Sequence, residues 1–415
     1  MRRLRQHFDR IRETHPGDQL LIVFDLDGAV LDEPAAAGQP LHRTDGIDGC
    51  EPRIRARPGV LEVIRWFQLQ PSTSVGFTTR RPEDRRDDTL RTLLHLGREL
   101  RAEFDVDLLS MGRGDPVESL LTFAEGGYRT FAVVESDPVV IEALAHAHHG
   151  DDILFLDARQ PTGGHFDLTA LIAEPDLPGH VSVAWHGVND ETNLRQFLDS
   201  PVLWAECDVR RDPEGRLVLR HDSFEETPAA RHEQLLPFAM AVEAIAERGR
   251  RLKLDLKQGT SLLPEIVSVL DAHGFADDAL WFNARIDVLG ADGFGTLRSR
   301  YPGAIVQCPI DFLGPLVLAA PDHARATLQM LTTWGISRLS VGWGTDLTAP
   351  LLDALQRWAY EVNIYGVPDL RSFLRAVLLL PHSLTADFNF PEWNYFGRGS
   401  GERLRYLHDS APARG

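Results

Sequence analysis

Eight short apolar segments alternate with helical or loop segments over about 235 residues from His180 onward, and this alternation limits the folds open to the chain. Strands that alternate with helices form parallel sheets, and eight such units are the number that closes a (β/α)8 barrel. The eight segments are 181–187, 201–209, 251–257, 279–285, 304–310, 337–343, 360–366 and 383–390. The sequence therefore predicts an α/β barrel with a hairpin at 215–222 inserted after its second strand.

The first part of the chain alternates in the same way. Its first apolar strand, "LLIVFDLDGAVLD" at 20–32, contains Asp25 and Asp27 where the apolar run ends. Further strands are expected over 73–80, near 108, over 129–136 and over 152–157, and helices from Pro58, over 83–96, from Pro116 and from Pro138. This order predicts a doubly wound parallel sheet in a domain over 1–160, with an inserted loop at 33–56. A linker over 161–179 and the barrel over 180–415 follow.

The composition is typical of a globular protein without a membrane segment. Of the 415 residues, 43% are hydrophobic and 25% charged, and no apolar run is long enough to span a bilayer. The basic N-terminal segment is not followed by the apolar stretch of a secretory signal. Three widely spaced cysteines favour a reducing cytoplasm. A formal net charge of -18 argues against nucleic acid as a general partner, and the oligomeric state stays open.

The sequence contains only two lysines, Lys253 and Lys257, among its 43 lysine and arginine residues. In a strand these two side chains share one face with Asp255, while the intervening leucines share the other face. An ammonium is compact, whereas a guanidinium is planar and longer, so the pair indicates a site that needs a small cation. The alternative, an amphipathic edge strand with its charges in water, gives no reason to exclude arginine.

Polar residues lie at or near the ends of successive predicted barrel strands. They are His186, Glu206, Asp208, His221, Lys253, Asp255, Lys257, Asn283, Arg285, Trp343 and Asp387. The C-terminal ends of barrel strands meet at one face, where the active sites of such barrels lie. We therefore expect these side chains to converge, although any one of them, such as Trp343, could be structural.

The motifs "HGVND", "AECDV", "LRHD" and "LKLDLKQG" resemble those of the phospholipase C-like phosphodiesterase barrels. That group includes the glycerophosphodiester phosphodiesterases and the sphingomyelinase D-type phospholipases. Within it, "WHGVND", "LKLDLK", "WFNARI" and "LSVGWGTD" look most like the menorin branch (family with sequence similarity 151), over nearly all of 180–392. Asp255 stands where glycerophosphodiesterases usually have glutamate, so the substrate identity is not implied.

The resemblance implies a metal-dependent reaction on a phosphodiester. Mg²⁺ or Ca²⁺ would be bound by Glu206, Asp208 and Asp255, an all-oxygen set that suits hard cations. The expected general base and acid are His186 and His221, and Lys257 and Lys253 would bind the non-bridging phosphate oxygens. The residues expected to bind the substrate or its phosphate are Asn283, Arg285, Trp343 and Asp387. Attack by water would give hydrolysis, whereas attack by a neighbouring substrate hydroxyl would give a cyclic phosphate.

The N-terminal domain resembles the haloacid dehalogenase-like phosphatases through "FDLDG", "FTTRRPEDRRDDTLRTLLHLG" and "VVESDP". The resemblance implies Asp25 as nucleophile, Asp27 as general acid/base, and Thr78 with Arg80 at the phosphate. A magnesium site would comprise Asp25, Asp27, Glu135 and Asp137. The domain contains no lysine for the family's phosphate contact, and Arg113 or Arg129 is the candidate substitute.

Together the two halves predict a metal-dependent phosphodiesterase for a small glycerophosphodiester or lysophospholipid, fused to a phosphomonoesterase that removes phosphate from the product. One alternative is a phospholipase D-like lyase that forms a cyclic phosphate. Another is a non-catalytic phosphate-binding barrel, with the N-terminal domain alone active, or neither domain.

Overall fold

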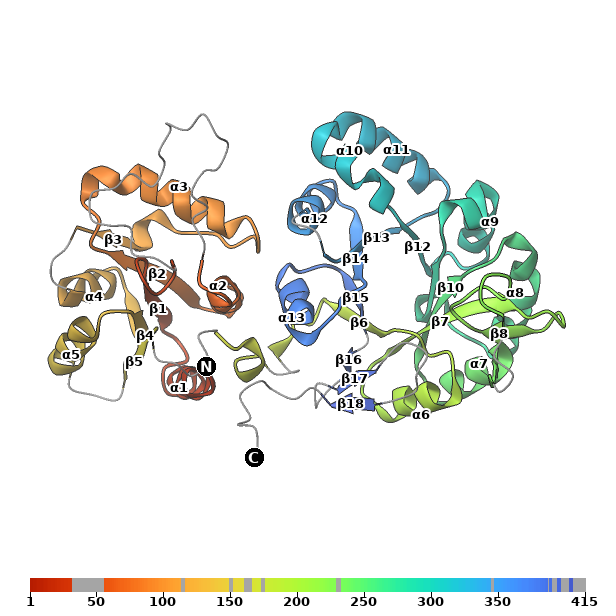
Figure 1. The fold of residues 1–415 in the computed structure, drawn as a ribbon, viewed down its shortest axis with the longest axis horizontal. Helices are drawn as coiled ribbons and strands as arrows, with labels where there is room; N and C mark the ends of the chain where they lie inside the picture. The colour runs from red at the N-terminus through yellow and green to blue at the C-terminus, as the bar shows by residue number, and fades with distance from the viewer. Residues whose placement is uncertain are drawn as a thin grey trace. The chain divides into compact units, whose positions relative to one another are not determined.

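The computed structural model describes residues 1–31, 56–112, 116–148, 152–159, 166–172, 176–228, 233–344 and 347–386, with the backbone of three short strands beyond them. The chain divides into two compact units, one within Met1–Ala173 and one within Glu174–His408 (Figure 1). The division falls inside the segment expected to be a linker. The described part of that segment is not all linker, because Leu168, Leu171 and Ile172 are buried.

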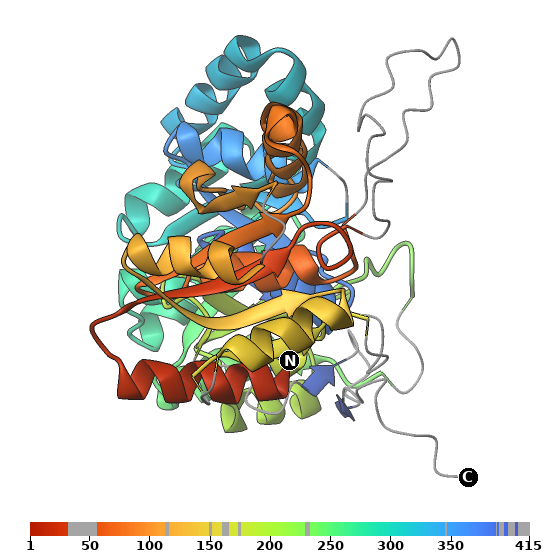
Figure 2. The same cartoon turned by 90° about the vertical axis from the view of Figure 1, so that its left-hand side faces the viewer.

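In the described part of the first unit, five parallel strands form one sheet in the order β3-β2-β1-β4-β5 (Figure 1, Figure 2). The strands are β1 (Gln19–Asp25), β2 (Thr73–Thr79), β3 (Leu109–Met111), β4 (Tyr128–Glu135) and β5 (Leu154–Asp157). The helices are α1 (Arg2–Thr14), α2 (Val60–Gln68), α3 (Arg86–Gly97), α4 (Pro116–Glu125) and α5 (Pro138–Ala147). The predicted parallel sheet is confirmed, and the predicted loop over 33–56 lies outside the described residues.

Helices cover both faces of this sheet. On one face, Val23 of β1 lies in an apolar cluster with Phe123 of α4 and Leu144 of α5. Elsewhere in the unit, Phe8 of α1 packs edge-on against Phe67 of α2, with 5.3 Å between the ring centroids. Figure 1 shows α4 and α5 on one side of the sheet and α2 on the other. Burial on both faces explains why the strands read as continuous apolar runs.

The helix expected from Pro58 begins two residues later, at Val60. Gly59 precedes it with a φ of +85°, and a Cβ at this position would come within 2.4 Å of the Phe166 carbonyl oxygen. The Phe166 amide also donates to the Pro58 carbonyl at 3.3 Å. The late start therefore results from a contact with a residue about a hundred positions away, which local sequence does not reveal.

Eight parallel strands, all within the described residues, close into a barrel in the second unit (Figure 1). They are β6 (Ser182–Trp185), β7 (Trp204–Arg211), β10 (Arg251–Leu256), β11 (Leu280–Asn283), β12 (Ile305–Pro309), β13 (Arg338–Gly342), β14 (Glu361–Tyr365) and β15 (Ser383–Ala386). The ring is complete because β7 pairs with both β6 and β10, and β15 pairs with β6. All eight predicted strands are confirmed.

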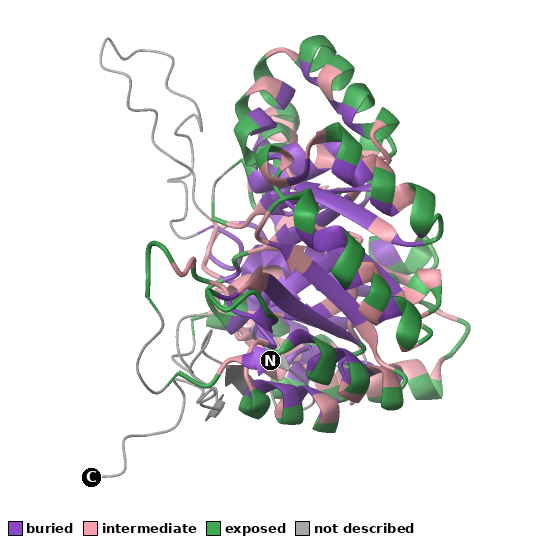
Figure 3. Cartoon of the chain, turned by 90° about the vertical axis from the view of Figure 1, so that its right-hand side faces the viewer, coloured by how far each residue is buried: buried purple, intermediate pink, exposed green. Residues whose placement is uncertain are grey.

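The barrel helices lie between these strands along the chain and cover the outside of the barrel. They are α6 (Glu191–Asp199), α7 (Phe238–Glu247), α8 (Leu263–Ala272), α9 (Ile286–Arg300), α10 (Gly314–Ala319), α11 (Pro321–Thr333), α12 (Thr348–Arg357) and α13 (Leu370–Leu378). The predicted hairpin is formed by β8 (Leu217–Leu219), which runs antiparallel to β7 and pairs with β9 (Leu236–Pro237). Figure 3 shows buried strands beneath helices whose outer faces are exposed.

The pairing of β7 with β10 determines which side chains meet. Glu206 lies opposite Lys253, and Asp208 lies opposite Asp255. Side chains alternate between the two faces of a strand, so these four residues share the face that lines the barrel interior. The neighbouring leucines of β10 are fully buried on the other face, as expected.

Strand β15 is shorter than the predicted eighth strand. It ends at Ala386, and Asp387 lies outside the described residues. The next segment, β16 (Phe388–Asn389), pairs instead with β17 (Asn394–Phe396), which pairs with β18 (Arg403–Arg405). In the described ranges, no helix combines the length and apolar character needed to cross a membrane.

Candidate functional site

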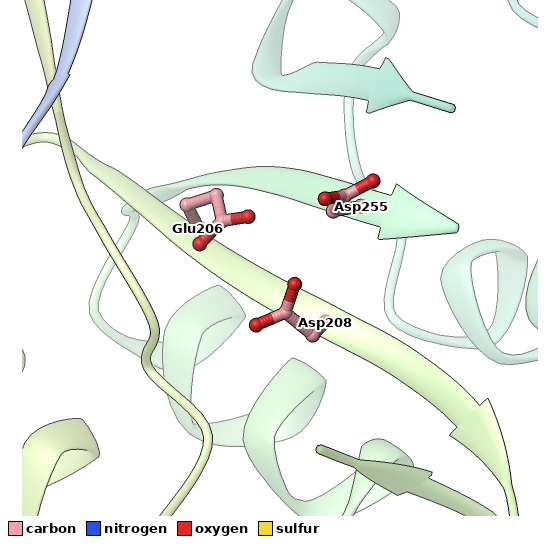
Figure 4. A group of neighbouring side chains, drawn as sticks. All are labelled: Glu206, Asp208 and Asp255. Carbon is pink, nitrogen blue, oxygen red and sulfur yellow. The ribbon is translucent and has the colours of Figure 1, made fainter. Parts of the chain in front are cut away.

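Three carboxylates form a compact group on two neighbouring barrel strands. Glu206 and Asp208 come from β7 and Asp255 from β10, and each offers an oxygen within 4.8 Å of the others (Figure 4). Glu206 and Asp208 are 3% and 1% exposed. The structure therefore brings together the whole carboxylate set expected from the sequence.

Each carboxylate of this triad is held by a neutral donor. The Asn189 side-chain amide donates to Asp208 Oδ2 at 2.6 Å, and the Asn283 amide donates to Asp255 Oδ1 at 3.0 Å. The backbone amide that follows His186 donates to Glu206 Oε2 at 2.8 Å. Asn283 was expected at the site and Asn189 was not, although Asn189 lies three residues after His186 in a predicted strand-end motif. These bonds fix the orientation of the carboxylates before any ligand arrives.

Lys257 is the cation in contact with two members of the triad. Its ammonium nitrogen lies 2.6 Å from Asp255 Oδ2 and 2.9 Å from Asp208 Oδ1. Burial by itself would lower the pKa of Lys257, but the charges of Asp208 and Asp255 outweigh it, so that pKa is raised. Lys257 is therefore a permanent positive charge at the mouth of the barrel.

The pKa values of the two β7 carboxylates, Glu206 and Asp208, are shifted in opposite directions. Burial raises the pKa of Glu206, and the neighbouring charge of Asp208 raises it further. Burial acts on the pKa of Asp208 in the same direction, but the charges of Lys257 and His186 outweigh it and lower that pKa. Asp208 is therefore the anionic centre of the triad.

The two predicted acid/base histidines lie in different settings. His186 Nε2 is 4.0 Å from Glu206 Oε2, so this imidazole borders the triad. His221 follows β8, and its Nδ1 lies 2.8 Å from Asp222 Oδ1. The backbone carbonyl of His221 accepts two hydrogen bonds, at 3.0 and 2.8 Å, from Arg210, two residues after Asp208 on β7. Arg210, which sequence reasoning missed, thus ties the His221 segment to the strand that bears the triad.

Lys253 lies deeper in the barrel than its position in the predicted site suggested. It is 2% exposed, and its ammonium donates to Thr385 Oγ1 at 2.6 Å. The same nitrogen lies 4.4 Å from the centroid of the Trp281 ring. Burial lowers the pKa of Lys253 to about 8. Because Lys253 precedes Asp255 by two residues on β10 and lies opposite Glu206, it is level with Glu206 and farther from the strand ends than Asp208 and Asp255.

The remaining substrate contacts expected in the barrel are only partly gathered at the site. Arg285 is 72% exposed in its side chain and pairs with Asp287, because the chain turns outward into α9 after Asn283. Trp343 is partly buried just after β13, where its amide donates to the Tyr365 carbonyl at 2.8 Å. Asp387 lies outside the described residues.

A second polar group lies at the ends of β1, β2 and β4 in the first unit. Asp25 is 9% exposed and accepts a hydrogen bond of 3.0 Å from Ser136 Oγ. Asp27 accepts one of 2.7 Å from Thr79 Oγ1, and Arg81 Nε lies 3.1 and 3.0 Å from its two oxygens. On β2, the residue that contacts Asp27 is therefore Thr79 and not its expected neighbour Thr78. Arg81 and Ser136, which contact Asp27 and Asp25, were not predicted from the sequence.

The four acidic residues expected to bind magnesium in this unit are occupied by different partners. Glu135 accepts hydrogen bonds from two backbone amides, including that of Asp137 at 2.9 Å. Asp137 caps the N-terminus of α5 and pairs with Arg80 at 2.8 Å. Among the described residues, only the barrel carboxylates form a group with the spacing of a metal site.

The arginine expected to replace the missing phosphate lysine is not near Asp25. Arg129 is the second residue of β4 and lies beside Leu20 near the start of β1, where it pairs with Asp18. Asp25 is at the other end of β1, so Arg129 is at the wrong end of a parallel sheet. Arg113, the other candidate, lies outside the described residues.

Asp25→Asn is expected to raise the thermal stability of the protein in alkaline solution. Burial, with the charge of Glu135, raises the pKa of Asp25 from 3.8 to about 8 in the folded state. The stability contributed by the protonated carboxyl is complete below the unfolded pKa and is lost as the pH rises through about 8. Melting temperatures at about pH 5 and pH 9 should therefore show a larger gain at the higher pH, because pH 9 lies above the folded-state pKa. A melting temperature of Asp25→Asn at about pH 9 that is equal to or below that of the wild type would contradict this prediction.

The fold and the triad define the protein as a (β/α)8 barrel with a buried three-carboxylate centre, joined to a parallel α/β unit. No known family model matches the sequence, and no curated protein matches it either. Similar solved structures include a glycerophosphodiester phosphodiesterase from Parabacteroides distasonis, with 14% identity, 50% of this chain and 92% of that chain covered, and a TM-score of 0.38.

Two further structures show the same extent of likeness. A phosphodiesterase from Oleispira antarctica, solved with the product sn-glycerol-3-phosphate, has 16% identity, covers 50% of this chain and 92% of that chain, and has a TM-score of 0.37. A glycerophosphodiester phosphodiesterase from Agrobacterium tumefaciens has 13% identity, covers 49% and 94%, and has a TM-score of 0.34. Likeness at this level does not assign an activity to this chain.

Proposed function

We propose that the barrel is a metal-dependent phosphodiesterase that acts on a small glycerophosphodiester or a lysophospholipid. The observation that carries this proposal is the buried triad of Glu206, Asp208 and Asp255 with the Lys257 ammonium against it and the His186 imidazole at its edge. A cation site, a fixed positive charge and a proton carrier are what cleavage of a phosphodiester requires.

The triad fits a hard divalent cation, Mg²⁺ or Ca²⁺. Asp208 Oδ1 is buried, and the Lys257 ammonium 2.9 Å away is the cation that neutralises it. A buried set made only of carboxylates suits a hard divalent ion, which supplies two charges where the ammonium supplies one. When bound there, such an ion polarises the phosphoryl group and offsets the charge that develops on it.

The chain's own residues have the remaining roles in the proposed cleavage of the phosphodiester. Lys257 binds a non-bridging phosphate oxygen as a point charge, and Asn189 and Asn283 keep the carboxylates oriented. His186 is the proposed general base and His221 the proposed general acid, since imidazoles exchange protons near neutral pH. If a substrate hydroxyl attacks in place of water, the same residues produce a cyclic phosphate.

Turnover of a chromogenic diester tests this function. Bis(p-nitrophenyl) phosphate should be hydrolysed with added Mg²⁺ or Ca²⁺ and not after chelation, and a panel of glycerophosphodiesters and lysophospholipids should identify the substrate. Detection of both free and cyclic phosphate products distinguishes hydrolysis from cyclisation. Absence of diester cleavage with every divalent ion would leave the barrel as a phosphate-binding module.

We propose that the first unit is a haloacid dehalogenase-like phosphomonoesterase that acts on the product of the barrel in the cytoplasm. Supporting observations are the buried Asp25 at the end of β1 and the hydroxyl of Thr79 that bonds Asp27. Gly28 is also required there, since a Cβ on it would come within 2.3 Å of Ser136 Oγ. The bidentate contact of Arg81 with Asp27 favours the rival view, a unit that binds phosphate without hydrolysing it.

Asp25→Asn is expected to abolish p-nitrophenyl phosphate hydrolysis and to leave diester cleavage unchanged. The nucleophile of an aspartyl-phosphate mechanism cannot be an amide, and each unit has its own core. Both activities should be measured on the full chain at the same metal concentration. Loss of diester cleavage in a folded variant would mean that the two reactions share one site.

A further inference from the structure

The Lys257 ammonium lies where a divalent cation would have to bind. It hydrogen-bonds Asp255 Oδ2 at 2.6 Å and lies 2.9 Å from Asp208 Oδ1. These two carboxylates are also two of the three members of the triad. Lys257 is thus a charged group of the chain itself that already neutralises part of the proposed metal site.

The other oxygens of the two aspartates are already bonded to amides. Asp208 Oδ2 accepts from Asn189 and Asp255 Oδ1 accepts from Asn283. The Asn283 amide is itself held, because its oxygen accepts a hydrogen bond of 2.8 Å from Gln307. The oxygens that face Lys257 are therefore the ones left for a cation to bind.

Two cations on the same pair of oxygens repel each other strongly. Unit charges a few ångströms apart interact by several kcal/mol even at the effective dielectric constant of a protein surface, and a divalent ion doubles the effect. The Lys257 side chain is 20% exposed, whereas those of Asp208 and Lys253 are almost fully buried. Lys257 thus has access to solvent and can leave the carboxylates without disrupting the barrel core.

We propose that Lys257 is a tethered competitor of the metal ion, released from Asp208 and Asp255 when the ion binds and then available to an anionic phosphate group. Metal and phosphate binding are coupled through this one side chain. The inference rests on the proposed function only for the identity of the anion, because the competition concerns the metal alone. The inference adds an order of binding, in which the metal ion binds before the substrate. The positions of the site residues alone do not give this order.

Metal affinity in the absence of substrate tests the competition. Calorimetry with Mg²⁺ and with Ca²⁺ should show that Lys257→Met binds the ion at least about tenfold more tightly than the wild type, within the usual range of coupling between sites. Lys257→Gln is a second neutral variant in case the first does not fold.

A control separates direct competition from a general loss of positive charge. Arg210 is close enough for its charge to interact with Asp208, but its guanidinium bonds the His221 carbonyl. Arg210→Gln should therefore change the metal affinity much less than Lys257→Met. If the folded neutral variants bind metal no more tightly than the wild type, or if Arg210→Gln gives the same gain, the competition is refuted.

Binding of dimethyl phosphate tests the second half of the inference. With saturating metal, the wild type should bind this non-cleavable diester, and Lys257→Met should bind it at least about tenfold more weakly although its metal affinity is higher. Equal affinities in the two proteins would refute the coupling. No binding by the metal-loaded wild type would refute the coupling and the proposed function together, whereas the metal affinities decide the competition independently.

Discussion

Asp208→Asn is expected to weaken metal binding and diester cleavage together, with turnover reduced by at least about a hundredfold. The substitution removes one full negative charge from a triad in which Asp208 is 1% exposed and lies between Lys257 and Asn189. Asparagine preserves the volume, so the effect is electrostatic. Calorimetry for metal affinity and bis(p-nitrophenyl) phosphate for turnover are the measurements.

The matched control is Asp287→Asn, which removes a carboxylate that is 64% exposed and paired with Arg285 outside the site. This variant should retain wild-type metal affinity and turnover. Unchanged metal affinity in a folded Asp208→Asn variant would remove Asp208 from the metal site. Reduced stability of that variant, measured by thermal unfolding, has to be excluded first because the side chain is buried.

Lys257→Arg is expected to lose nearly as much diester cleavage as Lys257→Ala. The planar guanidinium cannot occupy the space of an ammonium that lies within 3 Å of both Asp208 and Asp255. Loss of such a charge-assisted contact typically costs about 2 to 4 kcal/mol of activation free energy, which is on the order of a hundredfold in rate. Steady-state kinetics on the best diester substrate measures it.

The control for Lys257→Arg is the reverse substitution, arginine to lysine, at another position of the same strand. Arg251 starts β10, where its side chain is 38% exposed and pairs with Asp278, so Arg251→Lys should have wild-type activity. If Lys257→Arg kept full turnover, the scarcity of lysine in this chain would have no functional meaning. The site would then need a cation of any shape.

The barrel and its triad were predictable because they depend on local rules. Strand periodicity places alternate residues on one face, and parallel neighbours end at the same rim, so Glu206, Asp208 and Asp255 meet. The same rule counts against one of our own candidates, since Arg129 lies near the beginning of its strand whereas Asp25 ends its own. That error was avoidable from the direction of the strands.

The partners of the site residues were not predictable in the same way. Arg81 reaches Asp27 across 54 positions and Gln307 reaches Asn283 across 24, and nothing in the local sequence distinguishes these side chains from other polar ones. The depth of Lys253 was hidden for a related reason, because its contact with Thr385 spans 132 positions. Side-chain contacts between distant segments appear only when the tertiary fold is known.

The last barrel strand to be synthesised holds the first one in place. The His186 amide donates to the Ala386 carbonyl at 3.0 Å, and the Lys253 ammonium donates to Thr385 of the same strand. A ribosome completes β6 about two hundred residues before β15, and proteins begin to fold from the N-terminal side during synthesis. A nascent chain that still lacks β15 has its carboxylates on β7 and β10, but the His186 amide and the Lys253 ammonium lack these two partners. The ring of eight strands therefore closes only when its final strand docks.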